Sequence, residues 1–474
     1  MTAEGGRRAK TADRRRAERR VGWARLWARA KQIIGSDPTG SDEDDLVVDE
    51  EVARVLAANA GRLKGGLAKV AQLAAYDPGA TLGGRSSDRG QWIERGEAAP
   101  RVVDPREPPR GATLPARAVL AGLWDRAPAV SGDAIARVIE ADLGRPPEAL
   151  FATWDPAPLA AASLGQVHAA TLADGTAVVV KVQYPGVAEA LRADLDDVAF
   201  VRKLAGSEIG RSLDDASLQA LGAAVRGELD YTAEARALAQ FAAAWRDHPT
   251  LRFPRVIGER SSARVLTMTR ARGKTVAMTA QAGSPEVRRH AALAIFAFAW
   301  GSPLAHGLCN ADPNPGNFLI DEAPDGSVAV WCLDFGCAFE LPDDVQGADR
   351  EIWWGLLDDD REAAAERFRL GLARAGLLRR ADTLASTAHR DWERALAAPL
   401  TTHGEFAWTA QYASELAGAT GRVLGAGGLA LPAKVLLLWR QRLGASAVIG
   451  MLDARAPFRR VLVELIGTGR RALR

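Results

Sequence analysis

Hydrophobic residues near the start of the chain recur with the spacing of amphipathic helices. Residues 52–76 and 114–145 both carry apolar side chains three and four positions apart. Between them, residues 77–113 are rich in Gly, Pro, Ser and Arg and show no sustained period, which is typical of a loop. These patterns predict a helical N-terminal extension over residues 52–150, with a loop inserted at 77–113.

Strand-like patterns dominate the next part of the chain. Two β-rich runs flank the turn Ala173-Asp174-Gly175, and Asp-Gly between such runs favours a β-hairpin. In chain order, the patterns predict strands at 157–163, 165–172 and 177–183, helices at 186–205 and 212–246, and strands at 253–258 and 263–269.

Helical spacing returns in the C-terminal part. An apolar helix is predicted at 285–305, strands at 318–321 and 328–333, and helices from 343 to the end. A small sheet-rich part followed by a helix-rich part favours an α+β fold with two lobes and a cleft between them. We expect the β-rich lobe to span 151–270 and the helical lobe 271–474.

Composition and charge exclude some classes of protein. The chain is 47% hydrophobic and 25% charged, which is ordinary for a globular protein. Its 61 basic and 59 acidic residues nearly cancel, so charge gives no reason to expect nucleic acid as a partner. Cys309, Cys332 and Cys337 lack the paired spacing of a metal site, and so few cysteines indicate a reducing, cytoplasmic compartment.

The first 51 residues are charged in two blocks. Eleven Lys or Arg and three acids occupy 1–34, and eight acids occupy 35–51, which predicts a disordered tail. An alternative is a helix on an anionic membrane surface, formed by apolar residues at helical spacing: Trp23, Leu26, Trp27, Ala30, Ile33 and Ile34.

No run of residues predicts a transmembrane helix. A span needs ~20 predominantly apolar residues, and the best candidate, 429–451, is interrupted by Pro432, Lys434, Arg440 and Arg442. We therefore expect a cytoplasmic protein that is soluble or peripheral to a membrane.

Short motifs along the chain point to phosphoryl transfer. Lys181 ends a β-rich run, as does the kinase lysine that contacts nucleotide phosphates. Asp312 precedes Asn317 by the interval of a kinase catalytic loop, and Asp334 opens an Asp-Phe-Gly motif after a predicted strand, turn and strand. Phosphoryl transfer needs mainly positioning and charge neutralisation, so this combination predicts a nucleotide–magnesium site.

Three further motifs make a family resemblance specific. The run from Ala160 to His168 resembles an alanine-rich loop that replaces the usual glycine-rich one, Glu228-Leu229-Asp230 with Glu234 resembles a Glu-x-Asp motif, and Lys69-Val70-Ala71-Gln72 resembles a Lys-x-Gly-Gln signature. With these motifs in order, the chain resembles the UbiB/AarF/ADCK family of atypical protein-kinase-like proteins over residues 52–345.

The resemblance implies a two-lobed protein-kinase-like fold and a role for each motif residue. Lys181 would bind phosphates and pair with Glu234, Asp312 would be the catalytic base or a metal-proximal acid, and Asn317 and Asp334 would hold Mg²⁺. The residues implied to bind ATP or ADP are Ala160, Ala161, Ala162, Ser163, Gln166, Lys181 and Met268. The residues implied to form a regulatory lid over the cleft are Lys69, Gln72, Glu228 and Asp230.

The lid also shapes the expected function. It would obstruct a protein substrate, so the resemblance implies a small or lipid-borne substrate, or ATP hydrolysis coupled to a conformational change. We therefore expect an atypical kinase or ATPase that supports isoprenoid quinone or other lipid metabolism. Its expected partners are the nucleotide, a lipid or quinone precursor, and an anionic membrane surface.

Three positions depart from the family pattern. Asn310 and Asn314 stand where the family has histidines, and Ala71 stands where it has glycine. Asparagine forms hydrogen bonds but, unlike histidine, cannot take up a proton at neutral pH. The alternative function is therefore a pseudokinase-like, nucleotide-sensing scaffold without significant turnover. We predict structural roles for His168 and His306, and core packing for Trp353 and Trp354.

Overall fold

The computed structural model describes most of the chain from residue 130 onwards. The described residues are 130–162, 164–188, 219, 222–223, 226–378, 386–427 and 429–469, together with 47–48 and 114–115. The chain divides into two units, one of Met1–Arg62 and Gly96–Ala127 and one of Leu63–Arg95 and Pro128–Arg474. The first unit contains an antiparallel pair of short strands, β1 (Val47–Val48) and β2 (Leu114–Pro115).

Several predictions fall outside the described residues. They are the charged tail other than Val47–Val48, the helix at 52–76 with the lid residues Lys69 and Gln72, the loop at 77–113, residues 116–129 of the helix predicted at 114–145, and most of the helix at 186–205. Both lobes and the candidate site belong to the second unit.

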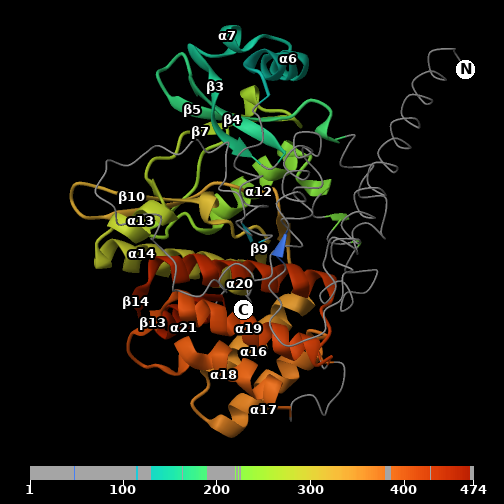
Figure 1. The fold of residues 1–474 in the computed structure, drawn as a ribbon, viewed down its shortest axis with the longest axis vertical. Helices are drawn as coiled ribbons and strands as arrows, with labels where there is room; N and C mark the ends of the chain where they lie inside the picture. The colour runs from blue at the N-terminus through green and yellow to red at the C-terminus, as the bar shows by residue number, and fades with distance from the viewer. Residues whose placement is uncertain are drawn as a thin grey trace, which may run out of the picture. The chain divides into compact units, whose positions relative to one another are not determined.

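The small lobe is built on a four-stranded antiparallel sheet. Its strands are β3 (Thr153–Ala162), β4 (Gly165–Thr171), β5 (Ala177–Gln183) and β7 (Val265–Thr269), in the order β3-β4-β5-β7. The sheet lies below the short helices α6 (Gly132–Leu143) and α7 (Pro147–Leu150) in Figure 1. The predicted hairpin is confirmed, with Gly175 in the left-handed region at φ 85°.

Alternation along β5 gives its two faces different roles. Val178, Val180 and Val182 are buried in a core that α6 completes with Ile135 and Ile139. Side chains alternate across a strand, so Lys181 projects from the opposite face.

The chain between β5 and β7 includes a helix, a two-residue strand and the 3-10 turn η1 (Gly258–Arg260). Helix α12 (Tyr231–Ala244) begins at Asp230, whose side chain accepts a hydrogen bond from the Thr232 N–H. The predicted uninterrupted helix over 212–246 is therefore wrong, because residues 228–230 form a turn and Asp230 starts a new helix. The predicted strand at 253–258 is also wrong. Only β6 (Leu251–Arg252) and a single bridge from Val256 to Met268 form there, since Pro254 has no N–H to donate.

The first half of the large lobe contains a long helix and several short strands. In chain order it contains β8 (Lys274–Thr275), α13 (Val276–Ala282), α14 (Pro285–Phe296), the π-helical turn η2 (Ala297–Gly301), α15 (Ser302–His306), β9 (Leu308–Asn310), η3 (Pro315–Asn317), β10 (Phe318–Glu322), β11 (Val328–Cys332) and β12 (Ala338–Glu340). The strands form two sheets, β6-β11-β10-β8 and β12-β9. The loops between these strands carry the candidate site.

The second half is almost entirely helical. In chain order it contains α16 (Asp343–Leu357), α17 (Arg361–Arg374), α18 (Thr387–Thr401), β13 (Phe406–Trp408), α19 (Ala410–Gly425), α20 (Ala433–Leu452), β14 (Ala454–Ala456) and α21 (Phe458–Gly469). The pair β13–β14 was not predicted, because a strand of three residues is too short to show a period.

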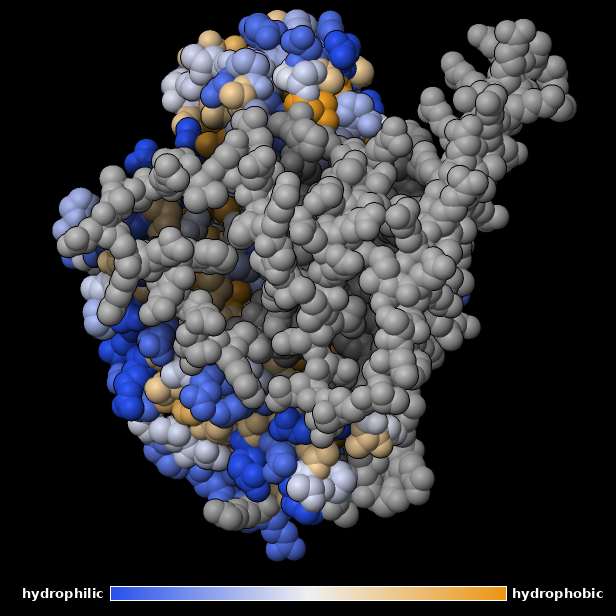
Figure 2. Space-filling view, in the orientation of Figure 1, coloured by the Kyte–Doolittle hydropathy of each residue, from blue (hydrophilic) through white to orange (hydrophobic). Residues whose placement is uncertain are grey.

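Helix α20 lies inside the large lobe. It is long and apolar enough, by length and composition, to cross a membrane, but 83% of its apolar window is buried in the protein. In Figure 1 it lies between α14 and α19, and it contacts both. The visible surface of this lobe is largely hydrophilic in Figure 2. This burial is typical of a core helix.

Candidate active site

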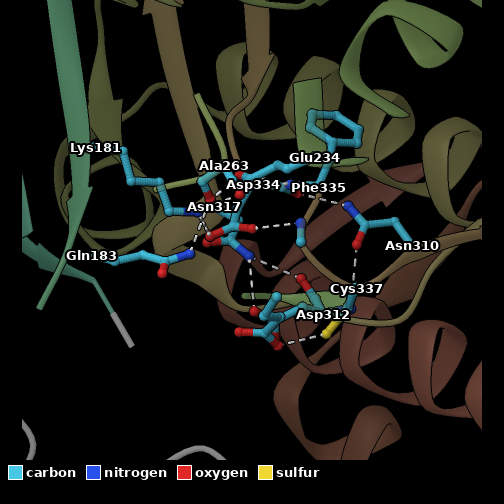
Figure 3. Close-up of polar contacts among 12 residues, drawn as sticks. Lys181, Gln183, Glu234, Ala263, Asn310, Asp312, Asn317, Asp334, Phe335 and Cys337 are labelled. Atoms are coloured by element: carbon cyan, nitrogen blue, oxygen red, sulfur yellow. Dashed lines mark hydrogen bonds and ion pairs between the residues drawn. The ribbon is translucent and has the colours of Figure 1, made fainter. Parts of the chain in front are cut away.

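An ion pair between Lys181 and Glu234 joins the sheet to helix α12 (Figure 3). The Lys181 ammonium lies 2.8 and 3.0 Å from the two Glu234 carboxylate oxygens, and both side chains are buried. Glu234 stands in the first turn of α12, which Asp230 caps. Gln183, two positions after Lys181 on the same face, donates a hydrogen bond to the Leu229 carbonyl and so fixes the chain just before this helix.

Asp334, whose side chain is 28% exposed, lies beside this buried pair. Its Oδ2 lies 3.1 Å from Lys181 Nζ. Burial disfavours the charged ammonium, but the Asp334 and Glu234 carboxylates outweigh burial and hold the pKa of Lys181 well above its ordinary value. The Tyr231 ring, with its centroid 5.0 Å from Lys181 Nζ, adds a cation–π contact. Lys181 therefore carries a fixed positive charge in the cleft.

The segment after Asp334 is held by its own turn and by the core. Asp334 Oδ1 accepts a hydrogen bond of 3.0 Å from the Gly336 N–H. Phe335 packs among aromatic rings, with its centroid 4.9 Å from that of Phe241 and 5.9 Å from that of Phe253. The turn and the buried Phe335 ring thus hold Asp334 in place, with its carboxylate directed at Lys181.

The loop from Asn310 to Asn317 brings a second carboxylate to the same region. Asn317 Nδ2 donates to the Asp312 carbonyl at 2.9 Å and approaches Asp312 Oδ2 at 3.4 Å. The Asn317 carbonyl accepts a hydrogen bond of 3.0 Å from the Leu333 N–H, which ties the loop to the residue before Asp334. The five-residue spacing thus folds Asn317 back onto Asp312.

The two unusual asparagines both have hydrogen-bonding roles. Asn310 Nδ2 donates to the Asp334 carbonyl at 2.8 Å, which links the two loops (Figure 3). Asn314 Oδ1 accepts a hydrogen bond of 2.8 Å from the Gly316 N–H and caps η3. Neither role requires a side chain that gains or loses a proton near neutral pH.

The residues present suit a magnesium ion. Mg²⁺ prefers oxygen ligands and is commonly held by one or two protein side chains together with phosphates and waters. The Asp334 carboxylate supplies such oxygens, and Asn317, whose Nδ2 is used by Asp312, has its Oδ1 for a cation. Among the described residues, no group of three or more His, Cys, Asp or Glu side chains could hold a metal by itself. A site shared with phosphates fits this donor set better than an all-protein cage.

The alanine-rich hairpin supplies the face above Lys181. Directly paired residues of antiparallel strands project to the same side. Val167 pairs with both Ala160 and Lys181, while Gly165 pairs with Ala162 and Gln183, so these alanines share the face of Lys181. Met268, paired with Val179, also lies on this face. Ser163 and the side chain of Ala161 lie outside the described residues.

Gln166 does not lie with the other residues implied to bind nucleotide. It projects from the opposite face of β4, is 1% exposed, and exchanges hydrogen bonds with the backbone N–H and C=O of Val130. Its amide also contacts His168 Nε2 at 2.9 Å. The expectation that Gln166 binds the nucleotide is therefore corrected. Adjacent residues of a strand project from opposite faces, so Gln166 points away from the face of Lys181.

The described half of the expected lid lies next to Asp334 and its turn. Glu228 is buried, and its Oε1 accepts a hydrogen bond of 2.8 Å from Cys337 Sγ, directly after the Asp-Phe-Gly motif. Asp230 caps α12, and its hydrogen bonds with Thr232 lower the pKa of its carboxyl group. Lys69 and Gln72 are outside the described residues, so the lid itself stays a prediction.

Two residues of α20 reach the site without any signal in the sequence. Arg440 Nη2 lies 3.5 Å from Asp312 Oδ1, and Gln441 Oε1 accepts a hydrogen bond of 2.7 Å from the Asn310 N–H. They come from 128 and 131 positions further along the chain. No local motif could have indicated them, because their role depends on tertiary packing alone.

The residues predicted to be structural are confirmed as such where described. His168 is fully buried, bonded to Gln166 and the Asp155 carbonyl. His306 ends α15 and packs edge-on against Trp245. Trp353 is buried, as are all three cysteines.

Comparisons with known proteins agree with this geometry. Residues 122–368 match the model of the ABC1 atypical kinase-like domain. Atypical kinase COQ8B, mitochondrial, of Rattus norvegicus is 31% identical over 49% of this chain and 43% of its own length. Atypical kinase COQ8, mitochondrial, of Saccharomyces cerevisiae is 33% identical over 48% of this chain and 45% of its own.

Mycobacterial relatives extend the similarity. An uncharacterized protein of Mycobacterium tuberculosis is 32% identical over 59% of this chain and 57% of its own length. The chain thus spans about half the length of the curated relatives it matches. A solved structure from the same organism, the complex of Rv3197 with erythromycin, has a TM-score of 0.55 and 26% identity, covering 89% of this chain and 97% of that one.

The family match covers more than half of the chain, and the solved relative shares the arrangement of a β-rich lobe and a helical lobe. The predicted two-lobed, protein-kinase-like α+β fold is therefore confirmed. This chain belongs to the ABC1 atypical kinase-like family, the family that includes the proteins named UbiB, AarF and ADCK.

Proposed function

We propose that this chain binds a magnesium nucleotide, ATP or ADP, and acts as an atypical kinase or ATPase. One observation carries the proposal. Lys181 from the small lobe and Asp334 from the large lobe meet at 3.1 Å, beside a loop that presents Asp312 and Asn317. A positive charge for phosphates, two oxygen ligands for a cation and a further carboxylate then share one cleft.

Each residue has a distinct task in this proposal. Lys181, oriented by Glu234 and Tyr231, neutralises phosphate charge. Asp334 and Asn317 hold the cation, and the Asp312 carboxylate receives the proton of the attacking hydroxyl or water, or stands near the metal. When bound, Mg²⁺ and the nucleotide supply the transferable phosphoryl group and offset its charge.

The proposed pathway rests on family resemblance. The family implies a role in isoprenoid quinone or other lipid metabolism, and we propose the same class of role for this chain, at an anionic membrane surface. The relatives COQ8B and COQ8 are named as mitochondrial proteins and a relative from Arabidopsis thaliana as a chloroplastic one, and these locations are those of the relatives.

A hydrolysis assay on purified protein tests the proposal. We expect Mg²⁺-dependent release of phosphate from ATP, measured with and without anionic vesicles, and its loss in Asp334→Asn. Asp325→Asn is a matched control, because it removes the same charge from the exposed β10–β11 turn. Asp325 there accepts a hydrogen bond from the Ser327 N–H. Undiminished turnover in Asp334→Asn would refute the site.

The same assay separates the enzyme from the alternative scaffold. Nucleotide binding that depends on Asp334, with no turnover under any lipid condition, would support a pseudokinase-like sensor instead. Deletion of residues 1–34 tests the membrane partner: weaker vesicle binding is expected if this segment is an anchor, and unchanged binding if it is only a tail.

Macrolide binding is a second candidate function, favoured by the solved relative in complex with erythromycin. If this property is shared, erythromycin should raise the midpoint of thermal unfolding with a saturable concentration dependence. An unchanged midpoint at all concentrations would exclude it for this chain.

A further inference from the structure

Three consecutive polar residues interrupt the buried face of α20. Arg440, Gln441 and Arg442 are 8%, 1% and 2% exposed, among apolar neighbours such as Leu438 and Trp439. Burying such side chains is unfavourable unless they find partners. Successive helical residues point about 100° apart, so the three reach different parts of the lobe.

Gln441 connects the π-helical turn to the start of the catalytic loop. Its Oε1 accepts hydrogen bonds from the Asn310 N–H at 2.7 Å and from Cys309 Sγ at 2.9 Å. Its Nε2 donates to the carbonyl of Ala299, inside η2, at 2.9 Å. π-Helical turns are frequent at functional sites. The Ala299 carbonyl of this turn accepts the hydrogen bond from α20.

Asn310 passes this contact on to Asp334. Its backbone N–H is held by Gln441, and its side-chain Nδ2 donates to the Asp334 carbonyl at 2.8 Å. Gln441 is therefore two hydrogen bonds away from the proposed metal ligand. Displacement of Asn310 would displace Asp334 relative to Lys181.

Arg440 acts on the other carboxylate of the site. Its guanidinium lies 3.5 Å from Asp312 Oδ1, and the two side chains are 7% and 8% exposed. A charge contact shielded from water is stronger than one at the surface. Neighbouring residues of one helix thus contact the loop that carries Asn310 and Asp312, and Asn310 in turn contacts Asp334.

Arg442 differs from its two neighbours. It makes a two-fold contact with Asp349 of α16, at 2.5 and 2.6 Å, and lies 4.8 Å from the Trp353 ring centroid. This ion pair anchors α20 to α16 rather than to the loops. Arg442 is therefore a matched control, buried in the same helix but directed elsewhere.

We propose that α20 sets the geometry of the candidate site, with Gln441 positioning Asp334 through Asn310 and Arg440 positioning Asp312. The inference deepens the proposed function and rests on it for its catalytic meaning. Gln441 and Arg440 are positioning residues, because they act through the loops.

Hydrogen exchange tests the positioning by itself, whether or not the protein turns over nucleotide. In Gln441→Leu, we expect amide exchange to accelerate about fivefold at residues 308–312, the factor that corresponds to losing one hydrogen bond. We also expect faster exchange at 333–337, through Asn310. In Arg442→Lys, exchange at both segments should be no faster than the variant's change in global stability explains. Unchanged exchange at 333–337 in Gln441→Leu would overturn the link to Asp334.

Magnesium dependence tests the catalytic meaning. With a fluorescent adenine nucleotide as the probe, Gln441→Leu should raise the Mg²⁺ concentration for half-maximal binding by about tenfold, as for other residues that orient metal ligands. Gln441→Glu, which keeps an acceptor for the Asn310 N–H, should shift it less. An equal shift in Arg442→Lys, or none in a folded Gln441→Leu, would refute the proposal. Wild-type protein that binds no Mg²⁺–nucleotide would refute the proposed function instead, while exchange still decides the positioning.

Discussion

At the scale of single residues, the candidate site contains fewer positive than negative groups around Lys181. One ammonium, Lys181, faces two carboxylates, of which Glu234 is buried and Asp334 is partly exposed. Removing either carboxylate leaves the ammonium with a partner. Removing the ammonium leaves the Glu234 and Asp334 carboxyl groups without the charge that offsets them, and burial already raises the pKa of Glu234 to about 7. The three substitutions should therefore differ in their effects on stability.

We therefore predict that Lys181→Met is more destabilising than Glu234→Gln. The first should lower the free energy of unfolding by about 3 kcal/mol, since it leaves buried charge uncompensated. The second should cost less, because Asp334 still pairs with Lys181. Urea denaturation of both variants in nucleotide-free buffer measures the difference, and equal losses would contradict the charge arrangement.

A second residue-scale prediction concerns acid. Burial, with a smaller effect from Arg252, lowers the pKa of His248 to about 4, and burial also lowers the pKa values of His168, His306 and His389. The unfolded chain binds these protons more readily, so stability is complete above pH 6.5 and falls as the pH drops towards 4. His248 Nδ1 accepts hydrogen bonds from the Leu251 and Thr250 N–H groups, which a proton would prevent.

His248→Asn tests this prediction, because asparagine offers an acceptor that does not titrate. The loss of unfolding free energy between pH 7.5 and pH 5 should be smaller in the variant than in the wild type. A loss of the same size would show that His248 is not among the groups responsible.

At the scale of elements, the β3–β4 hairpin depends on one glycine. A Cβ on Gly165 would lie 2.1 Å from the Val182 carbonyl oxygen, because β4 begins directly against β5. Gly165→Ala must therefore displace one strand from the other. The displacement would tilt the face that carries Ala160 and Ala162.

We predict that Gly165→Ala lowers the midpoint of thermal unfolding and weakens nucleotide binding together. Gly347→Ala is the control, because a Cβ at this position in α16 meets nothing within 4 Å. That change should be neutral or stabilise by up to about 1 kcal/mol, since alanine favours helix. A tolerated Gly165→Ala would show that the hairpin adapts.

The elements also show how far the sequence could predict the structure. Strand β5 was predicted with its observed bounds, since its run of valines and the Asp-Gly turn before it both act locally. The site around Asp312 and Asn317 was predictable for the same reason, because spacing within one loop fixes it. Gln166 was misassigned because a motif names residues and not the face from which they project. Arg440 and Gln441 could not be predicted, because only packing brings α20 to the loop.

At the scale of the whole molecule, the apolar residues form two main cores. α6 and the valines of β5 form one, and the helices of the large lobe form the other together with Phe335, α12 and Leu266 and Met268 of β7. A ligand held by Lys181 on one side and by Asp334 on the other would bind to both lobes. Its binding should therefore stabilise the folded chain as a unit.

We predict that a magnesium nucleotide raises the midpoint of thermal unfolding by several degrees. At a free concentration of 100 times the dissociation constant, binding contributes about 2.7 kcal/mol. The shift should require Mg²⁺ and be lost in Lys181→Met and Asp334→Asn, but persist in Asp325→Asn. A shift of equal size with inorganic phosphate and Mg²⁺ would indicate a phosphate effect rather than nucleotide recognition.

The place of α20 in the chain has a consequence for how the protein is made. Asn310 emerges from the ribosome 131 positions before Gln441, a delay on the order of ten seconds at usual rates of synthesis. During that time the nascent loop has no Gln441 to bind and the new helices have no central partner to pack on. A chain whose synthesis stalls before residue 433 would carry every recognisable motif and yet lack an ordered site, which makes it a substrate for chaperones and proteases.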